Sequence, residues 1–184
     1  MGLNHVGPIS LTALNCLVND GWFLGTTKKI GLRIYQNSHS PAGVDPLAAE
    51  AIAIASSAGF SIGGYMEICR GINATSQINS VGALVNSLVT YDIATFGKGP
   101  RVWVKVEPSV NSECDWAGYS HTDNCNFLTE IINAIQSIPS VTAGVTSTAK
   151  IWNDFFGTSC DTMVNSGALV SYAHYNRNGP ISST

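Results

Sequence analysis

Hydrophobic and polar positions follow two periodicities that alternate along the chain. Segments in which every second residue is apolar predict strands, and segments with apolar residues three and four positions apart predict helices. The predicted strands are residues 2–6, 29–35, 60–69, 101–109, 140–147 and 168–175, and the predicted helices are residues 10–18, 45–59, 73–92, 127–138 and 150–156. Strand and helix alternate throughout, which favours an α/β fold, a parallel sheet or a β/α barrel, in a single domain of residues 1–184.

The strand in residues 101–109, RVWVKVEPS, stops at a proline and carries two charged groups near its end. Its three valines would face one side, and Trp103, Lys105 and Glu107 would face the other. Charge inside a strand is costly unless it is paired or functional. Both charges lie at the carboxyl end of the strand, where α/β sheets build their sites. The pair therefore favours an active or once-active site over a structural ion pair.

Polar and aromatic residues follow the carboxyl ends of several predicted strands, and such ends converge on one face of an α/β fold. The candidate site residues are Asn4, Tyr35, Tyr65, Glu67, Lys105, Glu107, Thr146, Tyr172, His174 and Asn176. Converging aromatic and polar groups suit a carbohydrate site. Glu113 and Asp115 on the following loop are within possible reach of it. Trp103 and Trp152 are expected in the core, whereas Trp22 and Trp116 are open between surface positions and sugar-stacking platforms.

Charge and hydropathy exclude several classes of function. Only 11% of the residues are charged, the formal net charge is −3, and no basic cluster is present. This composition argues against binding to nucleic acid or to an anionic membrane surface. No apolar stretch approaches the roughly 20 residues that span a bilayer, so no membrane insertion is expected. The histidines lack metal-ligand spacing with one another, and we expect neither a metal nor a cofactor.

Five cysteines are many for a cytosolic chain, and none has CxxC metal spacing. Cys114 and Cys125 bracket a polar loop and form the most plausible disulfide. The odd count leaves one thiol free or paired with another chain. Asn73-Ala74-Thr75 is an N-glycosylation acceptor sequence. No signal peptide is visible, but together these features favour a secreted protein.

Seven groups of short stretches stand in the same order as the sequence motifs of one enzyme family. They are Gly2-Leu3-Asn4 with Cys16-Leu17, Arg33-Ile34-Tyr35-Gln36, Val44-Asp45-Pro46 with Ala58-Gly59, Tyr65-Met66-Glu67-Ile68-Cys69, residues 102–107, residues 144–152, and Tyr172-Ala173-His174-Tyr175. Through them the chain resembles glycoside hydrolase family 25, the lysozymes of the Chalaropsis type, and most closely the branch found in nematodes and amoebae. The resemblance covers residues 2–176 and implies an irregular TIM-like β/α barrel.

The resemblance also implies cleavage of the β-1,4 bond that follows N-acetylmuramic acid in peptidoglycan. The chain departs from the family at two catalytic positions: the aspartate of the first strand is Asn4 here, and the aspartate of the Asp-x-Glu pair is Lys105. Glu107 remains at the position of the general acid. The family continues past Tyr-Ala-His-Tyr into a further strand with another acidic residue; here that tail is absent, or the chain ends early.

These departures bear directly on the chemistry. Glycoside hydrolysis ordinarily needs one carboxylic acid with a raised pKa and a second carboxylate. A lysine two residues from Glu107 on the same face favours the ionised carboxylate, which is a poor proton donor near neutral pH. The sequence thus indicates a lysozyme-like protein with impaired or absent hydrolase activity, which would bind a glycan, a peptidoglycan fragment or a partner protein through the old cleft.

Two other functions stay open. Glu67 could supply a displaced second carboxylate, which would make the protein an active muramidase or another glycosidase with Glu107 and Glu67 as its pair. The competing interpretation is that Glu67 pairs with Lys105, as buried charges usually do. Alternatively, the low charge, the odd cysteine and an incompletely closed barrel would suit a structural extracellular protein that assembles as a homo-oligomer.

Overall fold

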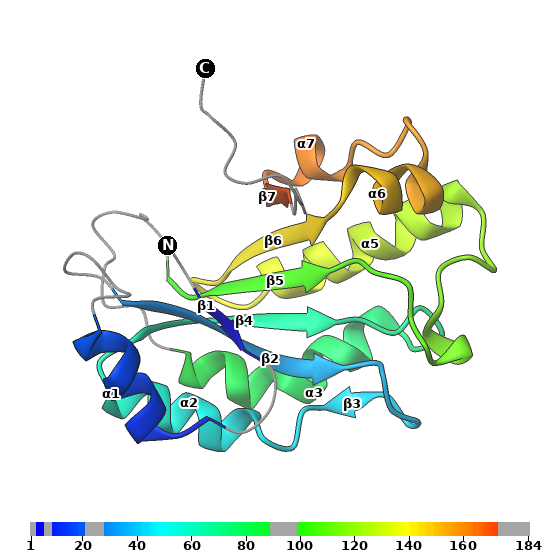
Figure 1. The fold of residues 1–184 in the computed structure, drawn as a ribbon. Coiled ribbons are helices and arrows are strands. Elements are labelled where there is room, and N and C mark those ends of the chain that lie inside the picture. The colour runs from blue at the N-terminus through cyan, green and yellow to red at the C-terminus, as the bar shows by residue number, and fades with distance from the viewer. Residues whose placement is uncertain (1–2, 6–8, 21–27, 89–98, 173–184) are drawn as a thin grey trace.

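The computed structural model describes residues 3–5, 9–20, 28–88 and 99–172, and within them strands alternate with helices (Figure 1). The elements are β1 (Leu3–His5), α1 (Leu11–Asn19), β2 (Lys29–Gln36), β3 (Gly43–Val44), α2 (Ala48–Ser57), β4 (Ser61–Glu67), α3 (Ala74–Ser87), β5 (Arg101–Lys105), the 3-10 turn η1 (Ser112–Cys114), α5 (His121–Gln136), β6 (Thr142–Ser147), α6 (Ala149–Phe156), α7 (Thr162–Ser166) and β7 (Leu169–Tyr172). Each of the six predicted strands overlaps one of these strands.

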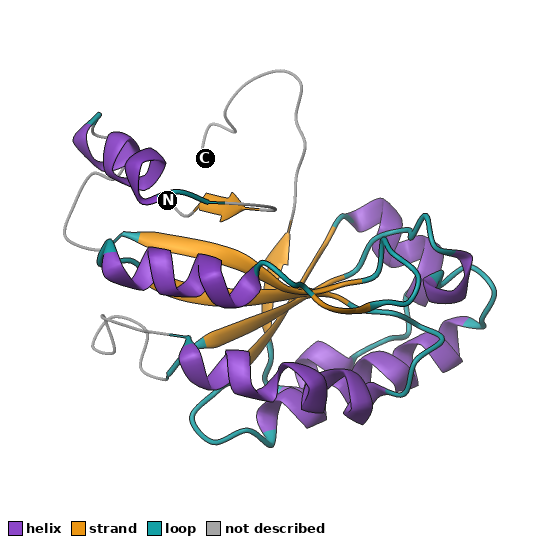
Figure 2. Cartoon of the chain, turned by 90° about the horizontal axis from the view of Figure 1, so that it is seen from below, coloured by secondary structure: helices purple, strands orange, loops and turns teal. Residues whose placement is uncertain are grey.

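The described strands form one sheet in the order β1-β2-β4-β5-β6-β7, and every pair of neighbours in this order is parallel. The short β3 pairs with β2 in the antiparallel direction. Helices α2, α3 and α5 pack against the strands and against one another, so that the strands are lined by helices along their length (Figure 2). The predicted α/β fold with a parallel sheet is therefore confirmed.

Helix boundaries follow local capping rather than the apolar pattern alone. Helix α5 begins at His121 instead of at Phe127, because the Ser120 hydroxyl accepts the backbone N–H of Asp123 at 3.1 Å and donates to its carboxylate at 2.7 Å. Helix α2 begins at Ala48, because the carboxylate of Asp45 accepts the backbone N–H of Leu47 in a turn before the helix. The short elements β3 and α7 have too few residues to show a period.

The core lies between the sheet and the helices, and α5 contributes Phe127, Leu128, Ile131, Ile132 and Ile135 to it at helical spacing. Trp116 is fully buried there, and its ring centroid lies 5.8 Å from that of Phe127, 6.1 Å from that of Phe155 and 5.3 Å from that of Phe156. Burial rules out both the surface position and the sugar-stacking role for this tryptophan. Trp22 lies outside the described residues.

Two disulfides join Cys69 to Cys114 and Cys125 to Cys160. The predicted Cys114–Cys125 disulfide is wrong: Cys114 lies in η1 beside the end of β4, whereas Cys125 is in the first part of α5 near the segment that leads into α7. Closeness in sequence therefore did not decide the pairing. Cys16 is exposed on α1 and is the free thiol. Among the described helices, none is long and apolar enough to cross a membrane.

Candidate functional site

The carboxyl ends of neighbouring strands bring three predicted site residues into one row. Glu67 on β4 is the register partner of Lys105 on β5, and Lys105 is the partner of Thr146 on β6. Partners across a parallel ladder point to the same face, so the row follows from the period of two in each strand. The valines of β5 are fully buried on the opposite face, as the alternation predicted.

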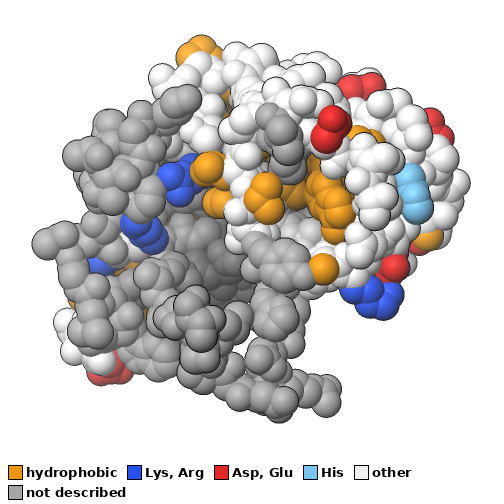
Figure 3. All heavy atoms as spheres, turned by 90° about the horizontal axis from the view of Figure 1, so that it is seen from above, with side chains coloured by type: hydrophobic (Ala, Val, Ile, Leu, Met, Phe, Trp, Pro, Cys, Tyr) orange, Lys and Arg blue, Asp and Glu red, His pale blue; other side chains and the backbone are white. Residues whose placement is uncertain are grey.

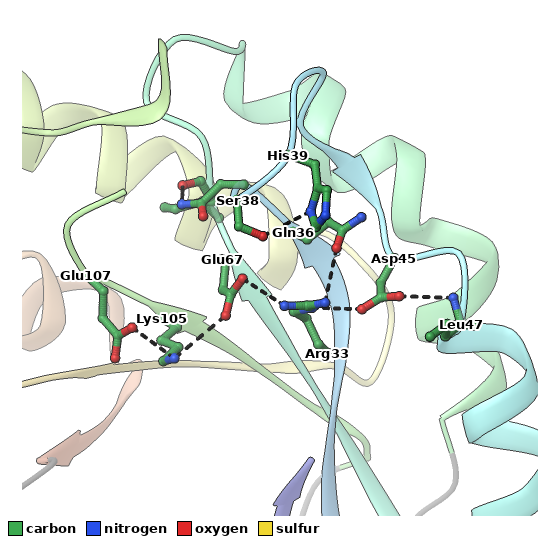
Figure 4. Close-up of polar contacts among 11 residues, drawn as sticks. Arg33, Gln36, Ser38, His39, Asp45, Leu47, Glu67, Lys105 and Glu107 are labelled. Carbon is green, nitrogen blue, oxygen red and sulfur yellow. Dashed lines mark hydrogen bonds and ion pairs between the residues drawn. The ribbon is translucent and has the colours of Figure 1, made fainter. Parts of the chain in front are cut away.

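Lys105 lies between two carboxylates (Figure 4). Its ammonium nitrogen Nζ is 2.9 Å from Oε2 of Glu107 and 3.7 Å from Oε1 of Glu67. The side chains of Glu67, Lys105 and Glu107 are 16%, 29% and 40% exposed, so the charge pairs are partly shielded from water. The expected pairing of Glu67 with Lys105 is present, and Glu107 shares the same cation.

A second cation extends this network toward β2. The Arg33 guanidinium donates to Oδ2 of Asp45 at 2.7 Å, to Oε2 of Glu67 at 3.3 Å and to the side-chain oxygen of Gln36 at 3.0 Å (Figure 4). Asp45 is almost fully buried. Burial opposes the charge of Arg33, but its carboxylate partners outweigh that effect and raise its pKa. Glu67 thus lies between the side chains of Arg33 and Lys105.

The sequence analysis did not place Arg33 and Asp45 in the site. A signal for Arg33 was present, since it is a charged residue inside the otherwise apolar strand KIGLRIY, as Lys105 is inside its own strand. Asp45 carried no comparable signal, because it lies in a turn between β3 and α2. Its position depends on β3 folding back along β2 in the antiparallel direction.

A depression of about 150 Å³ lies beside the carboxylates and the lysine. It is lined by Asn37, Ser38, Glu67, Lys105, Glu107, Pro108, Ser109 and Val110. Hydroxyl groups, an amide and charged groups therefore face one small volume, with the strongly exposed Val110 among the lining residues. This arrangement can offer hydrogen bonds to a polar ligand with many hydroxyl groups.

The two predicted tyrosines occupy different environments. Tyr65 is 7% exposed, and the ammonium of Lys105 lies 6.0 Å from its ring centroid. Burial and the nearby charge of Glu67 raise the pKa of Tyr65 to about 12. Tyr35 is 2% exposed and belongs to the hydrophobic core, where burial raises its pKa. Tyr35 consequently offers a ligand almost no surface.

The remaining predicted site residues are described in part or not at all. The backbone of Asn4 pairs with Gly31 on β2, and the backbone of Tyr172 pairs with Ser147 on β6. His174 and Asn176 lie outside the described residues. On the loop after β5, Asp115 accepts the backbone N–H of Trp116.

A larger and more apolar cavity of about 330 Å³ lies beside β6, β7 and α6. Trp152, Val145 and Val170 contribute its apolar surface, and Val170 is strongly exposed. Seen from above, hydrophobic side chains gather on the surface among uncharged polar ones (Figure 3). Within the described part of the chain, no group of three or more histidine, cysteine, aspartate or glutamate side chains is arranged to hold a metal ion.

Several solved structures share this fold. The muramidase from Acremonium alcalophilum matches with a TM-score of 0.68 at 13% identity, over 98% of this chain and 80% of that one. The lysozyme from Streptomyces coelicolor matches with a TM-score of 0.64 at 14% identity, over 98% and 76%. The family GH25 lysozyme from Aspergillus fumigatus matches with a TM-score of 0.60 at 16% identity, over 99% and 80%. These likenesses confirm the expected fold of the family 25 lysozymes.

Sequence comparison adds the family. No curated protein sequence matches this chain. A family model described as Lysozyme-like protein 1 (Lys-1) matches residues 1–184, which is the whole of the sequence. This match agrees with the parallel α/β fold and with the row of polar residues at the strand ends. The chain therefore belongs to the Lysozyme-like protein 1 (Lys-1) family and has the fold of the family GH25 lysozymes.

Proposed function

We propose that this protein is a lysozyme-like glycan-binding protein whose hydrolase activity is impaired or absent, and that it acts outside the cell. The observation that carries the proposal is the position of the Lys105 ammonium, 2.9 Å from Glu107 and 3.7 Å from Glu67. The two disulfides are consistent with an extracellular setting.

One oxygen of the Glu107 carboxylate is in contact with the Lys105 ammonium. A general acid must be protonated when the leaving oxygen departs, and neighbouring negative charge or burial favours its protonated form. An ammonium in hydrogen-bonding contact stabilises the carboxylate instead. Glu107 is also 40% exposed, so its ion pair with Lys105 lies at the edge of the solvent.

Glu67 is a poor substitute for the missing second carboxylate. Both of its oxygens are engaged, one by Arg33 and one by Lys105. A nucleophile or a base held between two cations loses much of its negative potential toward a substrate. The second candidate function is an active glycosidase that uses Glu107 and Glu67 as its catalytic pair. It would require the side chain of Lys105 to move away from both carboxylates.

The depression beside these residues supports the proposal of glycan binding. Ser38 and Ser109 supply hydroxyl groups and Glu107 supplies a partly exposed carboxylate, all suited to sugar hydroxyls. The similar structures are named as muramidases and lysozymes. A ligand of the peptidoglycan type is therefore the class that we propose for this site.

Clearing of a peptidoglycan suspension tests the loss of chemistry. Turbidity is followed from about pH 4 to about pH 8, a range that begins near ordinary carboxyl pKa values. We expect no clearing by the native protein or by Glu107→Gln, and measurable clearing by the double variant Asn4→Asp, Lys105→Asp. Clearing by the native protein that disappears in Glu107→Gln would show an active enzyme and direct attention to Glu67.

Titration calorimetry with a soluble disaccharide-peptide fragment of peptidoglycan tests binding. Ser109→Trp fills the depression and should weaken the affinity at least about tenfold, a loss of about 1.4 kcal/mol. Ser112→Trp is the matched control, because Ser112 lies on the same loop but does not line the depression. Absence of binding by the native protein, or equal binding by both variants, would reject the glycan site.

A further inference from the structure

The sequence Asn73-Ala74-Thr75 is the only Asn-x-Ser/Thr acceptor sequence among the 184 residues. The lysozyme-like fold gives it no role, since it lies at the start of α3 and lines neither of the two cavities described above. Whether such a sequence is a modification site depends on how the folded chain presents its asparagine. A bulky, hydrophilic glycan needs an acceptor on the surface.

The side-chain amide of Asn73 is oriented by the helix that it caps. Its oxygen Oδ1 accepts the backbone N–H of Ser76 at 3.0 Å and lies 3.4 Å from the Ser76 hydroxyl. A backbone N–H can only donate, so the oxygen has to face the helix and the nitrogen Nδ2 has to face away from it. No hydrogen bond from Nδ2 to any residue that the structure describes is found, and Asn73 is exposed.

The other two residues of the acceptor sequence alternate between surface and core. Thr75 is exposed, whereas Ala74 between them is 1% exposed and packs in the hydrophobic core. Ala74 thus anchors the first turn of α3 while both recognised side chains face solvent. A substituent on Nδ2 can leave the cap bond intact, because the cap uses Oδ1 alone.

The segment that presents Asn73 is firmly held. Cys69 forms a disulfide with Cys114, and the Gln77 side chain bonds both the N–H and the carbonyl oxygen of Cys69 at 2.8 Å. The Gln77 amide also donates to the carbonyl oxygen of Ile72 at 2.8 Å. A glycan at this point would rise from a fixed base, after the end of β4 that carries Glu67.

We infer that Asn73 is a site of N-linked glycosylation. In the reaction, Nδ2 of Asn73 attacks C1 of the first sugar of a lipid-linked oligosaccharide pyrophosphate donor, supplied by the secretory pathway of the host. The N–C1 bond forms, the C1–O bond to the pyrophosphate breaks, the lipid pyrophosphate leaves and Nδ2 loses one proton. The two disulfides fit the same oxidising compartment.

The test is secretion of the chain behind a signal peptide from a eukaryotic cell, followed by electrophoresis and intact-mass measurement before and after peptide N-glycosidase. We expect the native protein to shift by one discrete step, because one acceptor sequence is present. The enzyme converts the modified asparagine to aspartate, so peptide mapping should locate the change at residue 73.

Matched variants separate glycosylation from helix capping. Asn73→Asp keeps a capping carboxylate and removes the acceptor, and Thr75→Ala removes the recognised hydroxyl without touching the cap. Both should be secreted without the step in mobility, whereas Thr75→Ser should retain it. A native protein that is secreted with intact disulfides and has the same mass before and after the enzyme would overturn the inference. This outcome does not depend on whether the protein binds or cleaves a glycan.

Discussion

Tyr65 is the residue on which the site has the clearest electrostatic effect. It precedes Glu67 on the same face of β4, and its register partners are Arg33 on β2 and Trp103 on β5. Burial is the main cause that raises its pKa to about 12, and the negative charge of Glu67 adds to it. The fold therefore favours the neutral phenol over the phenolate, and stability becomes linked to alkaline pH.

The variant Tyr65→Phe should reveal this linkage. Below the unfolded pKa of about 10 the phenol is protonated in both states, so the gap between native protein and variant stays constant. As the pH rises from about 10 toward 12 the unfolded phenol ionises first, and the native protein should lose on the order of 2 kcal/mol relative to the variant. Urea unfolding at about pH 8 and about pH 11 measures the difference; an unchanged gap would contradict it.

The period of two in residues 101–109 predicted that Lys105 and Glu107 share a face, and adjacency of β4 and β5 in the sheet made Glu67 and Lys105 register partners. The contact of Arg33 with Asp45 could not be predicted in the same way. It depends on the turn after β3, where no repeated pattern is present. The burial of Tyr35 could not be predicted either, because a tyrosine in an alternating strand can lie on the buried or on the exposed face.

At the scale of one element, α5 shows how a polar residue can hold three segments together. Asn124 is 1% exposed; its amide donates to the carbonyl oxygens of Trp116 and Phe155, each at 3.0 Å, and its oxygen accepts from Arg70 at 3.1 Å. The Arg70 guanidinium also lies 4.0 Å from the ring centroid of Tyr119. The helix thereby joins the loop before it, α6 and the segment after β4.

Replacement of Asn124 by alanine should lower the free energy of unfolding by about 3 kcal/mol, because the carbonyl oxygens of Trp116 and Phe155 each lose a buried hydrogen bond and Arg70 loses one of its hydrogen bonds. Asn133→Ala is the matched control, since Asn133 is exposed on the same helix, and its effect should stay within about 0.5 kcal/mol. Chemical denaturation of both variants is the measurement. Equal effects would show that the Asn124 contacts add no net stability.

For the whole molecule, the alternation of strand and helix predicted the parallel sheet, and each predicted strand overlaps an observed one. The pattern of hydrophobic and polar positions could not predict which cysteines pair. Cys125 and Cys160 are separated by 35 residues and meet because α5 packs against α7, which begins two residues after Cys160. Packing of that kind is decided by the complete core, which no local pattern specifies.

Removal of this disulfide tests its contribution to the whole fold. The double variant Cys125→Ala, Cys160→Ala should lower the free energy of unfolding by about 2–4 kcal/mol, since the unfolded chain regains the freedom of the closed loop. Cys16→Ala removes an exposed thiol and serves as the control, with almost no expected change. A double variant as stable as the control would show that the disulfide contributes little.

The other disulfide has a consequence for the depression itself. Cys69 follows Glu67, and Cys114 follows the loop of Pro108, Ser109 and Val110 that lines the depression. The ring that this disulfide closes contains Lys105, Glu107 and residues 108–110, whereas Asn37, Ser38 and Glu67 on the other side of the depression lie outside it. The bond therefore links the loop that lines one side of the depression to the end of β4, two residues after Glu67. A reducing environment would remove this link, so the position of the loop relative to β4 would then depend on noncovalent packing alone.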